Sequence, residues 1–587
     1  MESSPAQINT FLFFNLFLFF KLIRKLRTVE NNQNKRNTTM KDRKSVDEQF
    51  EQWIDEKGRE ILAQSPIICT FFGIHDFSDE MGDPSMAQVE KNYQEALQAL
   101  DELHSYNKDE LHFENQVDYQ LLEDLVALVE FHHNRGADLT GFGNEGPVGT
   151  CGMAVFSLLT RDFAPLPTRL GHIVARIEKM PEYLECSKDT WVKPVKLFTQ
   201  IAMGECDHTP GMLQLVQQIL NNTPGVPEEV ENRAEQAIPR AIEAMGQYKT
   251  FLEQEVMPRA DNTWVMGEED FATILKLRRL PLTAEEIVQL GEQLFEETHQ
   301  RLTELARQID SRKSLDEVRE MVKGNHPTEY DTMLEDYRKS VAEAREFVLT
   351  HGIATIPDNE FLEVIETPSY MTPIIPFAAY VMPSHYDAKQ VGHYIVTRPR
   401  QPSMFAEHSY SSIANVSVHE AYPGHHLQNV VSSQKNSIMR KLQSGIETVE
   451  GWAHYCEQMM REEGYIESLE AEFAQELDVL WRAARMIIDV KLSTGQMTIG
   501  EAVEELVQKI GMDRQGATAE VTRYACSPGY PLSYLLGKKM MLELRDKVKT
   551  KLGQKYDQKD FHDLVLKSGG IPFHYVEQIV EHYTNSG

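Results

Sequence analysis

The 587-residue sequence is poor in cysteine, in positive charge and in long apolar runs. Its six cysteines include no CxxC pair and no closely spaced set, which excludes a disulfide framework and a thiolate zinc knuckle. Lysine and arginine number 59 against 90 aspartates and glutamates, giving a net charge of −31 that repels nucleic-acid phosphates and anionic lipid. We therefore expect no nucleic-acid partner.

The most apolar stretch, residues 11–23 (FLFFNLFLFFKLI), is interrupted by Asn15 and Lys21. It is shorter than the roughly 20 residues of a bilayer span. It also lacks the basic leader and the cleavage site that are typical of a signal peptide. We interpret residues 1–44 as a disordered, targeting or anchoring segment, with Met40 as an alternative start, and expect no stable membrane insertion.

Two sequons bear on the location of the protein. Asn221-Asn222-Thr223 and the NVS that begins at Asn415 would be eligible for glycosylation in a secretory compartment. A glycan at Asn415, four residues before His419, would crowd the histidine-rich segment described below. We therefore favour the cytoplasm, with a secreted or membrane-anchored form through residues 11–23 as the alternative.

Beyond Ser45 most of the sequence carries apolar residues at the spacings of an amphipathic helix. The clearest example begins at Thr283, where TAEE forms a capping box with Glu286 and is followed by apolar residues at helical spacing up to Ile309. A further helix is predicted over Tyr330–Thr350. The fold class is therefore mainly α.

Only one part of the chain departs from this helical period. Three β-rich runs occur at residues 361–367 (FLEVIET), 376–382 (PFAAYVM) and 393–399 (HYIVTRP), which predicts one small sheet. We divide the rest into an N-terminal helical region, residues 45–276, and a catalytic region, residues 277–587. The glycine-rich GFGNEGPVGTCG (residues 141–152) lacks a GK[ST] ending, so we expect a connector there instead of a phosphate-binding loop.

The strongest chemical signal is NVSVHEAYPGHHLQNVV, in which Glu420 follows His419 and the pair His425–His426 comes shortly after. Neutral imidazoles bind Zn²⁺, and a neighbouring carboxylate can take a proton from an activated water. In the usual H-E-x-x-H helix the two histidines lie about 40° and about 6 Å apart. Here Pro423 occupies the position of the second histidine.

Pro423 cannot donate an intrahelical hydrogen bond and Gly424 permits unusual dihedral angles, so the helix must be distorted within the motif. On a straight helix His425 would lie about 240° round from His419, whereas His426 would be aligned but about 10 Å along the axis. If residues 423 and 424 bulge outward, His425 takes the place of the second ligand. We prefer His425 over His426, and the spacing alone leaves both open.

The third ligand is expected from IETVEGWAHYCEQMM, which places Glu447, Glu450, His454 and Glu457 on one helix face. Glu450 lies 25 residues beyond His425, which leaves room for a turn and a returning helix. Two histidines and one carboxylate leave one coordination position for water, as in catalytic zinc sites. His454 and Glu457 are expected either to orient the ligands or to form a simple i, i+3 pair.

Three motifs in order, HEAYPGHH, EGWAHYCE and TRYACSPGYPLSYLLGKKMMLELR, make the chain similar to the DUF885 family, whose members resemble gluzincin metallopeptidases of the thimet-oligopeptidase type. The resemblance covers most of the chain beyond the N-terminal segment. It implies a large helical, zincin-like peptidase fold with the small β-sheet before the active-site helix. It also implies Zn²⁺ bound by His419, His425 and Glu450, with Glu420 as the general base.

The resemblance further implies that the third motif lies over the active site. There Tyr534 would donate a hydrogen bond to a developing oxyanion, and Arg523 would hold a substrate carboxylate. Tyr524 is another candidate substrate-binding residue, and His426 is expected either to contact the substrate or to support the metal ligands. Arg523 and Tyr524 equally fit a structural ion pair and a core aromatic residue.

These features favour a zinc-dependent hydrolase that cleaves short peptides as a carboxypeptidase, dipeptidase or oligopeptidase. One alternative is a zinc hydrolase of a non-peptide amide or ester. Another is a helical binding protein that has lost catalysis, although the presence of Glu420 beside three ligands argues against it. No oligomeric state follows from the sequence.

Overall fold

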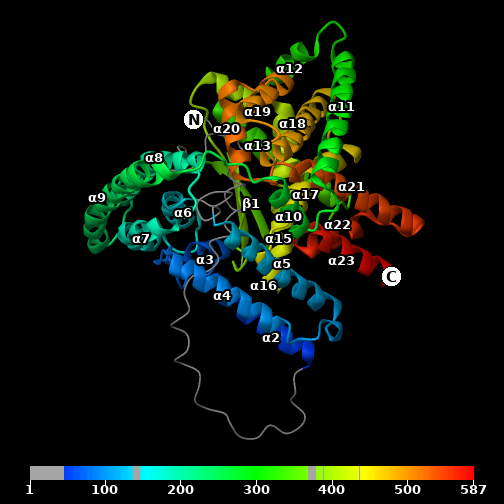
Figure 1. The fold of residues 1–587 in the computed structure, drawn as a ribbon. Coiled ribbons are helices and arrows are strands. Elements are labelled where there is room, and N and C mark those ends of the chain that lie inside the picture. The colour runs from blue at the N-terminus through cyan, green and yellow to red at the C-terminus, as the bar shows by residue number, and fades with distance from the viewer. Residues whose placement is uncertain (1–44, 137–145, 368–377, 388, 435–436, 587) are drawn as a thin grey trace. The chain divides into compact units, whose positions relative to one another are not determined.

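The computed structural model describes residues 45–136, 146–367, 378–387, 389–434 and 437–586 (Figure 1). In these residues the fold is mainly helical with one three-stranded sheet, which confirms the predicted class. The predicted disordered, targeting or anchoring segment, residues 1–44, lies outside them. Among the described helices, none combines the length and the apolar character that a membrane crossing requires.

The chain divides into two compact units that do not follow the order of the sequence. Among the described residues, the first unit contains 265–434 and 443–586, and the second contains 45–264 together with 437–442. The division at 264/265 precedes the predicted one at 276/277 because the helix that begins at Glu268 belongs to the first unit. The Gly267 N–H just before it donates to the Ser493 carbonyl at 2.9 Å.

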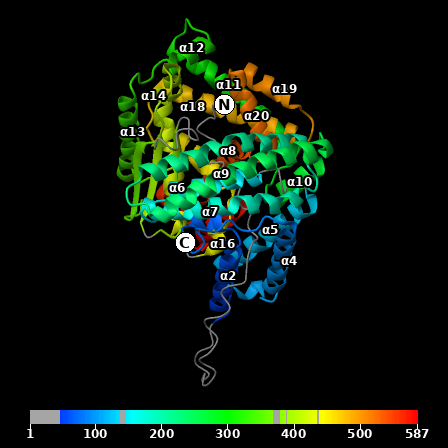
Figure 2. The ribbon, with the colours of Figure 1, turned by 90° about the vertical axis from the view of Figure 1, so that its left-hand side faces the viewer.

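The second unit consists of helices. Ser45 caps the first of them in a capping box with Glu48, as the helical pattern from this residue predicts. The helices α6 to α9 pack against one another in layers (Figure 2). The elements of this unit are α2 (Val46–Ala63), α3 (Pro66–Phe72), α4 (Met86–Leu103), α5 (Phe113–Arg135), α6 (Pro147–Thr160), α7 (Leu166–Cys186), α8 (Lys196–Asn222), α9 (Glu228–Phe251) and α16 (Ile438–Leu442).

The prediction of a glycine-rich connector over residues 141–152 is wrong for residues 147–152, because α6 begins at Pro147. Residues 141–145 lie outside the described residues. The Gly149 N–H donates to Glu205 Oε2 at 3.1 Å, and a Cβ at Gly149 would lie 2.8 Å from Glu205 Oε1. This glycine therefore permits close packing between α6 and α8.

The first unit is also largely helical, and α11 packs along α18 while α17 packs along α21 (Figure 1). The Thr283 capping box and the helix over Tyr330–Thr350 are both present. The helices are α10 (Glu268–Leu277), α11 (Ala284–Ile309), α12 (Leu315–Lys323), α13 (Tyr330–Thr350), α14 (Tyr410–Glu420), α15 (His425–Ser433), α17 (Ile446–Glu462), α18 (Leu469–Ser493), α19 (Ile499–Glu505), α20 (Arg514–Cys526), α21 (Ser533–Leu552), α22 (Gln558–Ser568) and α23 (Phe573–Ser586).

The predicted small sheet is present in the first unit, immediately before α14. It consists of β1 (Glu360–Glu366), β2 (Ala378–Val381) and β3 (Gln390–Val396). The strand order is β1-β3-β2, with β1 parallel and β2 antiparallel to the central β3. Glu360, which pairs with Gln390 at one end of this sheet, also contacts the histidine-rich segment described below.

Candidate metal centre

A bulge joins α14 to α15, and backbone hydrogen bonds link the two helices across it. The Gly424 N–H donates to the Val418 carbonyl at 3.1 Å. The Leu427 N–H donates in the same way to the Ala421 carbonyl at 3.4 Å. Both bonds span six residues, whereas an α-helix spans four, so the bulge accommodates two extra residues.

This bulge brings His419 and His425 together, six residues apart in the sequence. Their ring centroids lie 4.7 Å apart with the planes at 87°. A six-residue spacing minus the two inserted residues reproduces the four-residue spacing of H-E-x-x-H. The bulge expected at residues 423 and 424 is therefore present, and it supplies the alignment that a straight helix would deny.

Gly424 and the neighbouring helix α17 fix the shape of the bulge. A Cβ on Gly424 would lie 1.9 Å from the His419 carbonyl oxygen and 2.3 Å from that of Val418, so only glycine fits. Trp452 Nε1, on α17, donates to the Pro423 carbonyl oxygen at 2.8 Å. The helix that carries the third candidate ligand is thus bonded directly to the bulge.

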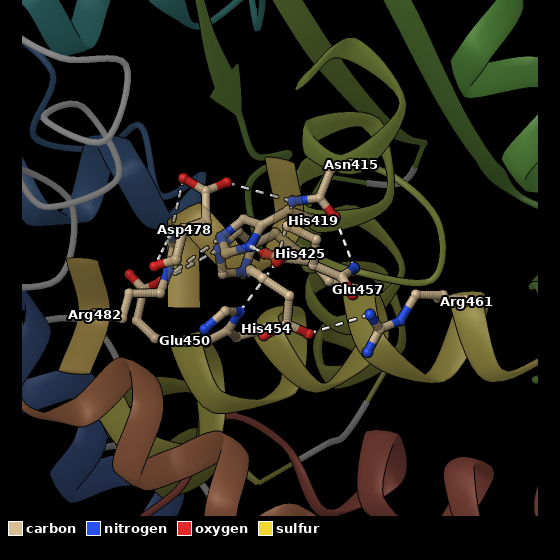
Figure 3. A network of polar contacts seen from close by, with 11 residues as sticks. Asn415, His419, His425, Glu450, His454, Glu457, Arg461, Asp478 and Arg482 are labelled. Carbon is tan, nitrogen blue, oxygen red and sulfur yellow. Dashed lines mark hydrogen bonds and ion pairs between the residues drawn. The ribbon is translucent and has the colours of Figure 1, made fainter. Parts of the chain in front are cut away.

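Glu450 of α17 completes the cluster (Figure 3). Its Oε2 lies 3.8 Å from His419 Nε2 and 3.6 Å from His425 Nε2. The three side chains are 8%, 2% and 2% exposed for His419, His425 and Glu450, and their ligand atoms all lie within 4.8 Å of one another. Ligands about 2.1 Å from a tetrahedral zinc ion would be roughly 3.4 Å apart.

The donor set fits a zinc ion. Both ring nitrogens of His425 are buried and have no hydrogen-bond partner among the described residues. A buried imidazole without a partner is unfavourable, and coordination of one nitrogen would satisfy it. Two imidazoles and one carboxylate are also a donor set that zinc accepts.

Close packing of α17 on α21 places Glu450 against two tyrosines. A Cβ on Gly451 would lie 2.4 Å from the carbonyl carbon of Gly537, so the two helices meet through glycine backbones. Tyr530, in the loop just before α21, donates from its hydroxyl to Glu450 Oε1 at 2.8 Å. The Tyr534 hydroxyl lies 3.4 Å from that of Tyr530. Glu450 Oε2 is thus left to face the histidines.

The protonation states suit this arrangement. Burial raises the pKa of Glu450, but the contacts with His425 and His419 outweigh it and lower that pKa to about 2. Burial and the charge of Glu450 raise the pKa of Tyr534 to about 12 and that of Tyr530 well above its usual range. The glutamate is therefore ionised and both phenols keep their protons at neutral pH.

Glu457, one of the four predicted face residues, orients the first histidine. His419 Nδ1 lies 2.6 Å from Glu457 Oε1, and His454 Nδ1 lies 3.1 Å from Glu457 Oε2. Burial alone would raise the pKa of the Glu457 carboxyl, but His454 and the bond from His419 hold it well below its usual range. Both expected roles of Glu457 occur together, because it contacts His454 at i, i+3 and His419 across helices.

The sequon asparagine Asn415 belongs to the same buried network (Figure 3). Its Nδ2 donates to Glu457 Oε2 at 3.2 Å, and its Oδ1 accepts from Gln475 at 3.0 Å. The residue is 2% exposed. A glycan on Asn415 therefore does not fit the folded protein.

Replacing Glu457 with glutamine is expected to weaken zinc binding by about 10- to 100-fold, because the His419 Nδ1–H would lose its charged acceptor. Competition with a chelating dye measures the affinity. Glu462→Gln is the matched control on the same helix, since Glu462 pairs with Arg545. Equal affinities for the two variants would contradict the orienting role.

His426 lies outside the cluster. Its Nδ1 is 3.0 Å from the Tyr380 hydroxyl and its Nε2 is 2.8 Å from Glu360 Oε2, so both nitrogens are occupied. Glu360 also accepts from the Tyr422 hydroxyl at 2.6 Å. His426 thus bonds the bulge to the sheet, in agreement with the supporting role, and its substrate contact stays a prediction.

The remaining predicted residues lie around the cluster. Glu420, half-buried, is the last residue of α14 and directly follows His419. Arg523 donates from Nη2 to Glu520 Oε2 at 2.7 Å. Tyr524 is fully buried and accepts from Trp481 Nε1 at 3.2 Å. The structural alternatives for Arg523 and Tyr524, an ion pair and a core aromatic residue, are thus both observed.

Asp489 of α18 shapes the tyrosine loop, a role that sequence reasoning missed. Its carboxylate accepts the Gly529 N–H at 2.9 Å and the Leu532 N–H at 3.0 Å, on either side of Tyr530. Burial raises the pKa of Asp489 to about 7 despite these bonds. The only sequence signal is an acidic residue among the apolar positions of RAARMIIDVKL.

Fold and cluster together define a large, mainly helical protein with a buried centre of two histidines and one glutamate. The chain belongs to the DUF885 family, described as "Bacterial protein of unknown function (DUF885)", which matches residues 66–580. No curated protein matches it in sequence.

Two solved structures share the fold. One is described as "a putative lipoprotein of unknown function from Shewanella oneidensis"; it is 21% identical, with a TM-score of 0.76 over 91% of this chain and 99% of that chain. The other is "the putative lipoprotein from Colwellia psychrerythraea", 18% identical, with a TM-score of 0.80 over 93% of this chain and 100% of that chain. At these identities the likeness concerns the fold alone.

Proposed function

We propose that the protein is a zinc-dependent hydrolase that cleaves peptide bonds of short peptides, on a zincin-like fold related to gluzincin peptidases. The observation that carries the proposal is the buried cluster of His419, His425 and Glu450, in which the ring nitrogens of His425 have no hydrogen-bond partner among the described residues. Glu420 beside the first ligand supplies the group that hydrolysis needs in addition to the metal.

A bound zinc ion would polarise the scissile carbonyl and lower the pKa of a water molecule. Glu420 accepts the proton that this water loses, and the water oxygen bonds to the carbonyl carbon. The C–N bond then breaks, and Glu420 returns the proton to the leaving amine. One peptide bond and one water thus give one new carboxylate and one new amine.

Tyr534 stabilises the oxyanion in this scheme. Its pKa of about 12 keeps the hydroxyl protonated. Its hydrogen is donated to the Tyr530 hydroxyl over a long 3.4 Å contact, a weak bond that it exchanges for a bond to the substrate oxyanion. Tyr530 holds Glu450 Oε1 through a 2.8 Å bond and so keeps the other carboxylate oxygen toward the two histidines, where it would bind a metal ion. In this scheme Tyr534 therefore contacts the substrate, whereas Tyr530 orients the metal ligand Glu450.

The location of the protein stays a prediction. The buried sequon at Asn415 supports a cytoplasmic form, because a glycan attached there in a secretory compartment would not fit the buried network around Glu457. The description of both structural neighbours as lipoproteins supports the anchored alternative through residues 11–23.

The test is metal content and turnover of the purified full chain. We expect one zinc per chain by mass spectrometry and hydrolysis within a mixed pool of short peptides. Removal of the metal with a chelator should abolish turnover, and added zinc should restore it. A protein that neither retains nor takes up zinc, and that leaves the pool intact, would contradict the proposal and favour a helical binding protein. Zinc uptake with turnover of amide or ester compounds but no peptide would identify the non-peptide hydrolase instead.

A further inference from the structure

Arg485 of α18 is a buried cation without a charged partner among the described residues. The residue is 1% exposed, and its Nε and Nη2 have no hydrogen-bond partner in the described part of the chain. No described carboxylate lies within ion-pair distance of it. Burial of an unpaired guanidinium is strongly unfavourable, so such groups normally meet an anion.

The Arg485 guanidinium lies beside the proposed catalytic tyrosine. Its central carbon is 3.6 Å from the centroid of the Tyr534 ring and 5.3 Å from that of Trp481. The aromatic faces attract the cation but provide no hydrogen-bond acceptor for its N–H groups. From Tyr534, successive contacts through the Tyr530 hydroxyl reach Glu450. A carboxylate bound to Arg485 would therefore belong to a substrate residue close to the cleaved peptide bond.

Arg523 supplies a second guanidinium, and the charges of Arg523 and Arg485 both act on Glu520. Arg523 of α20 uses Nη2 for Glu520, while its Nε and Nη1 have no partner among the described residues. Burial raises the pKa of Glu520, but Arg523 and, more weakly, Arg485 outweigh this and lower it. Glu520 forms its ion pair with Arg523, so Arg485 is left without a carboxylate at ion-pair distance among the described residues.

We propose that Arg485 and Arg523 together bind the C-terminal carboxylate of a short peptide substrate. The planar N–H pairs of arginine match the two oxygens of a carboxylate, and the positive charge of the two guanidinium groups compensates its negative charge. The enzyme then cleaves near the free C-terminus of its substrates and leaves internal bonds of long chains intact. This assignment rests on the proposed function and names its substrate class.

The kinetic test compares three N-acetylated peptides. Two share one sequence, as the free acid and as the C-terminal amide, and the third is an amide in which glutamate replaces the last residue. Wild-type zinc-loaded protein should prefer the free acid over both amides by at least about 100-fold in kcat/KM. The third peptide distinguishes a terminal carboxylate from one on a side chain. In Arg485→Met the preference should fall below about tenfold, and Arg485→Lys, which keeps the charge but loses the fork, should lie between.

Arg461→Met is the matched control. Arg461 is also partly buried and contacts α18, but its guanidinium is paired with Glu472 and Glu476. This variant should keep the wild-type preference for the free acid. Because the preference is a ratio within one protein sample, partial unfolding of a variant does not mimic its loss.

A binding measurement separates this proposal from the proposed function. With metal-free protein, calorimetry should detect the N-acetyl dipeptide acid but not its amide, and Arg485→Met should lose this difference. If wild type turns over acid and amide equally, the carboxylate assignment is wrong while the hydrolase stands. If no peptide is cleaved but the acid still binds through Arg485, the hydrolase is wrong and the anion site stands. Equal binding of acid and amide to metal-free protein would overturn the assignment independently of catalysis.

Discussion

Glu420→Gln is expected to lower kcat/KM for peptide hydrolysis by about 10³- to 10⁴-fold while the protein keeps one zinc per chain. Glutamine has nearly the same size but cannot accept the proton that the attacking water loses, nor return one to the leaving amine. Glu420 is half-buried at the end of α14 and is not one of the three clustered ligands, so its replacement should leave the metal in place. Peptide turnover and metal analysis on the same sample measure both effects.

Glu450→Ala is the counterpart for this experiment, because Glu450 is one of the clustered ligands. It should lose zinc and turnover together. A Glu420→Gln protein that also loses its zinc would show that Glu420 supports the metal instead of the proton transfer. Turnover within tenfold of wild type would exclude Glu420 as the general base.

The bulge is the part of the site that the sequence predicts best, because its causes are local. Pro423 removes an intrahelical hydrogen bond and Gly424 removes a Cβ, and both effects are visible in the letters alone. A bulge of two residues favours His425 as the second ligand, although the spacing alone leaves His426 open. In the structure, the hydrogen bonds from Gly424 to Val418 and from Leu427 to Ala421 each span six residues, as a two-residue bulge requires.

Helical periodicity places four polar side chains on one face of α17 but does not rank them. Tertiary contacts do so. Glu447 is engaged by Arg278, and Glu457 by His419 and His454, whereas Glu450 directs one oxygen into the cluster. Arg278 lies 169 residues from Glu447 in the sequence, so no local pattern reveals that pairing.

The contacts of His426 depend on the sheet, which explains why the sequence alone does not reveal them. Its partners Glu360 and Tyr380 lie 66 and 46 residues away and come from β1 and β2. The same holds for Arg485 of α18, which no motif of the sequence singles out. Its significance comes from the absence of a partner among the described residues, and only three-dimensional contacts can reveal such an absence.

Gly424→Ala carries the second large expected effect, because the new Cβ would meet backbone and not a side chain that can turn away. The positions 1.9 Å from the His419 oxygen and 2.3 Å from the Val418 oxygen lie far inside van der Waals contact. Relief requires the bulge to open, which breaks the six-residue hydrogen bonds and moves His425 away from His419. We expect metal-free protein to lose at least about 2 kcal/mol of unfolding free energy in denaturant titrations.

Zinc affinity should fall in the same variant by about 100-fold or more, because an ångström-scale displacement of one ligand disrupts the tetrahedral set. Gly500→Ala is the control, since Gly500 lies in α19 and a Cβ there would meet no described atom within 4 Å beyond its own helix backbone. Alanine at that position should be neutral or stabilising by up to about 1 kcal/mol. A Gly424→Ala protein with normal stability and zinc affinity would show that the alignment of the histidines does not depend on the bulge. Loss of zinc affinity without loss of stability would instead locate the effect in ligand geometry alone, as expected if the two helices can separate without unfolding.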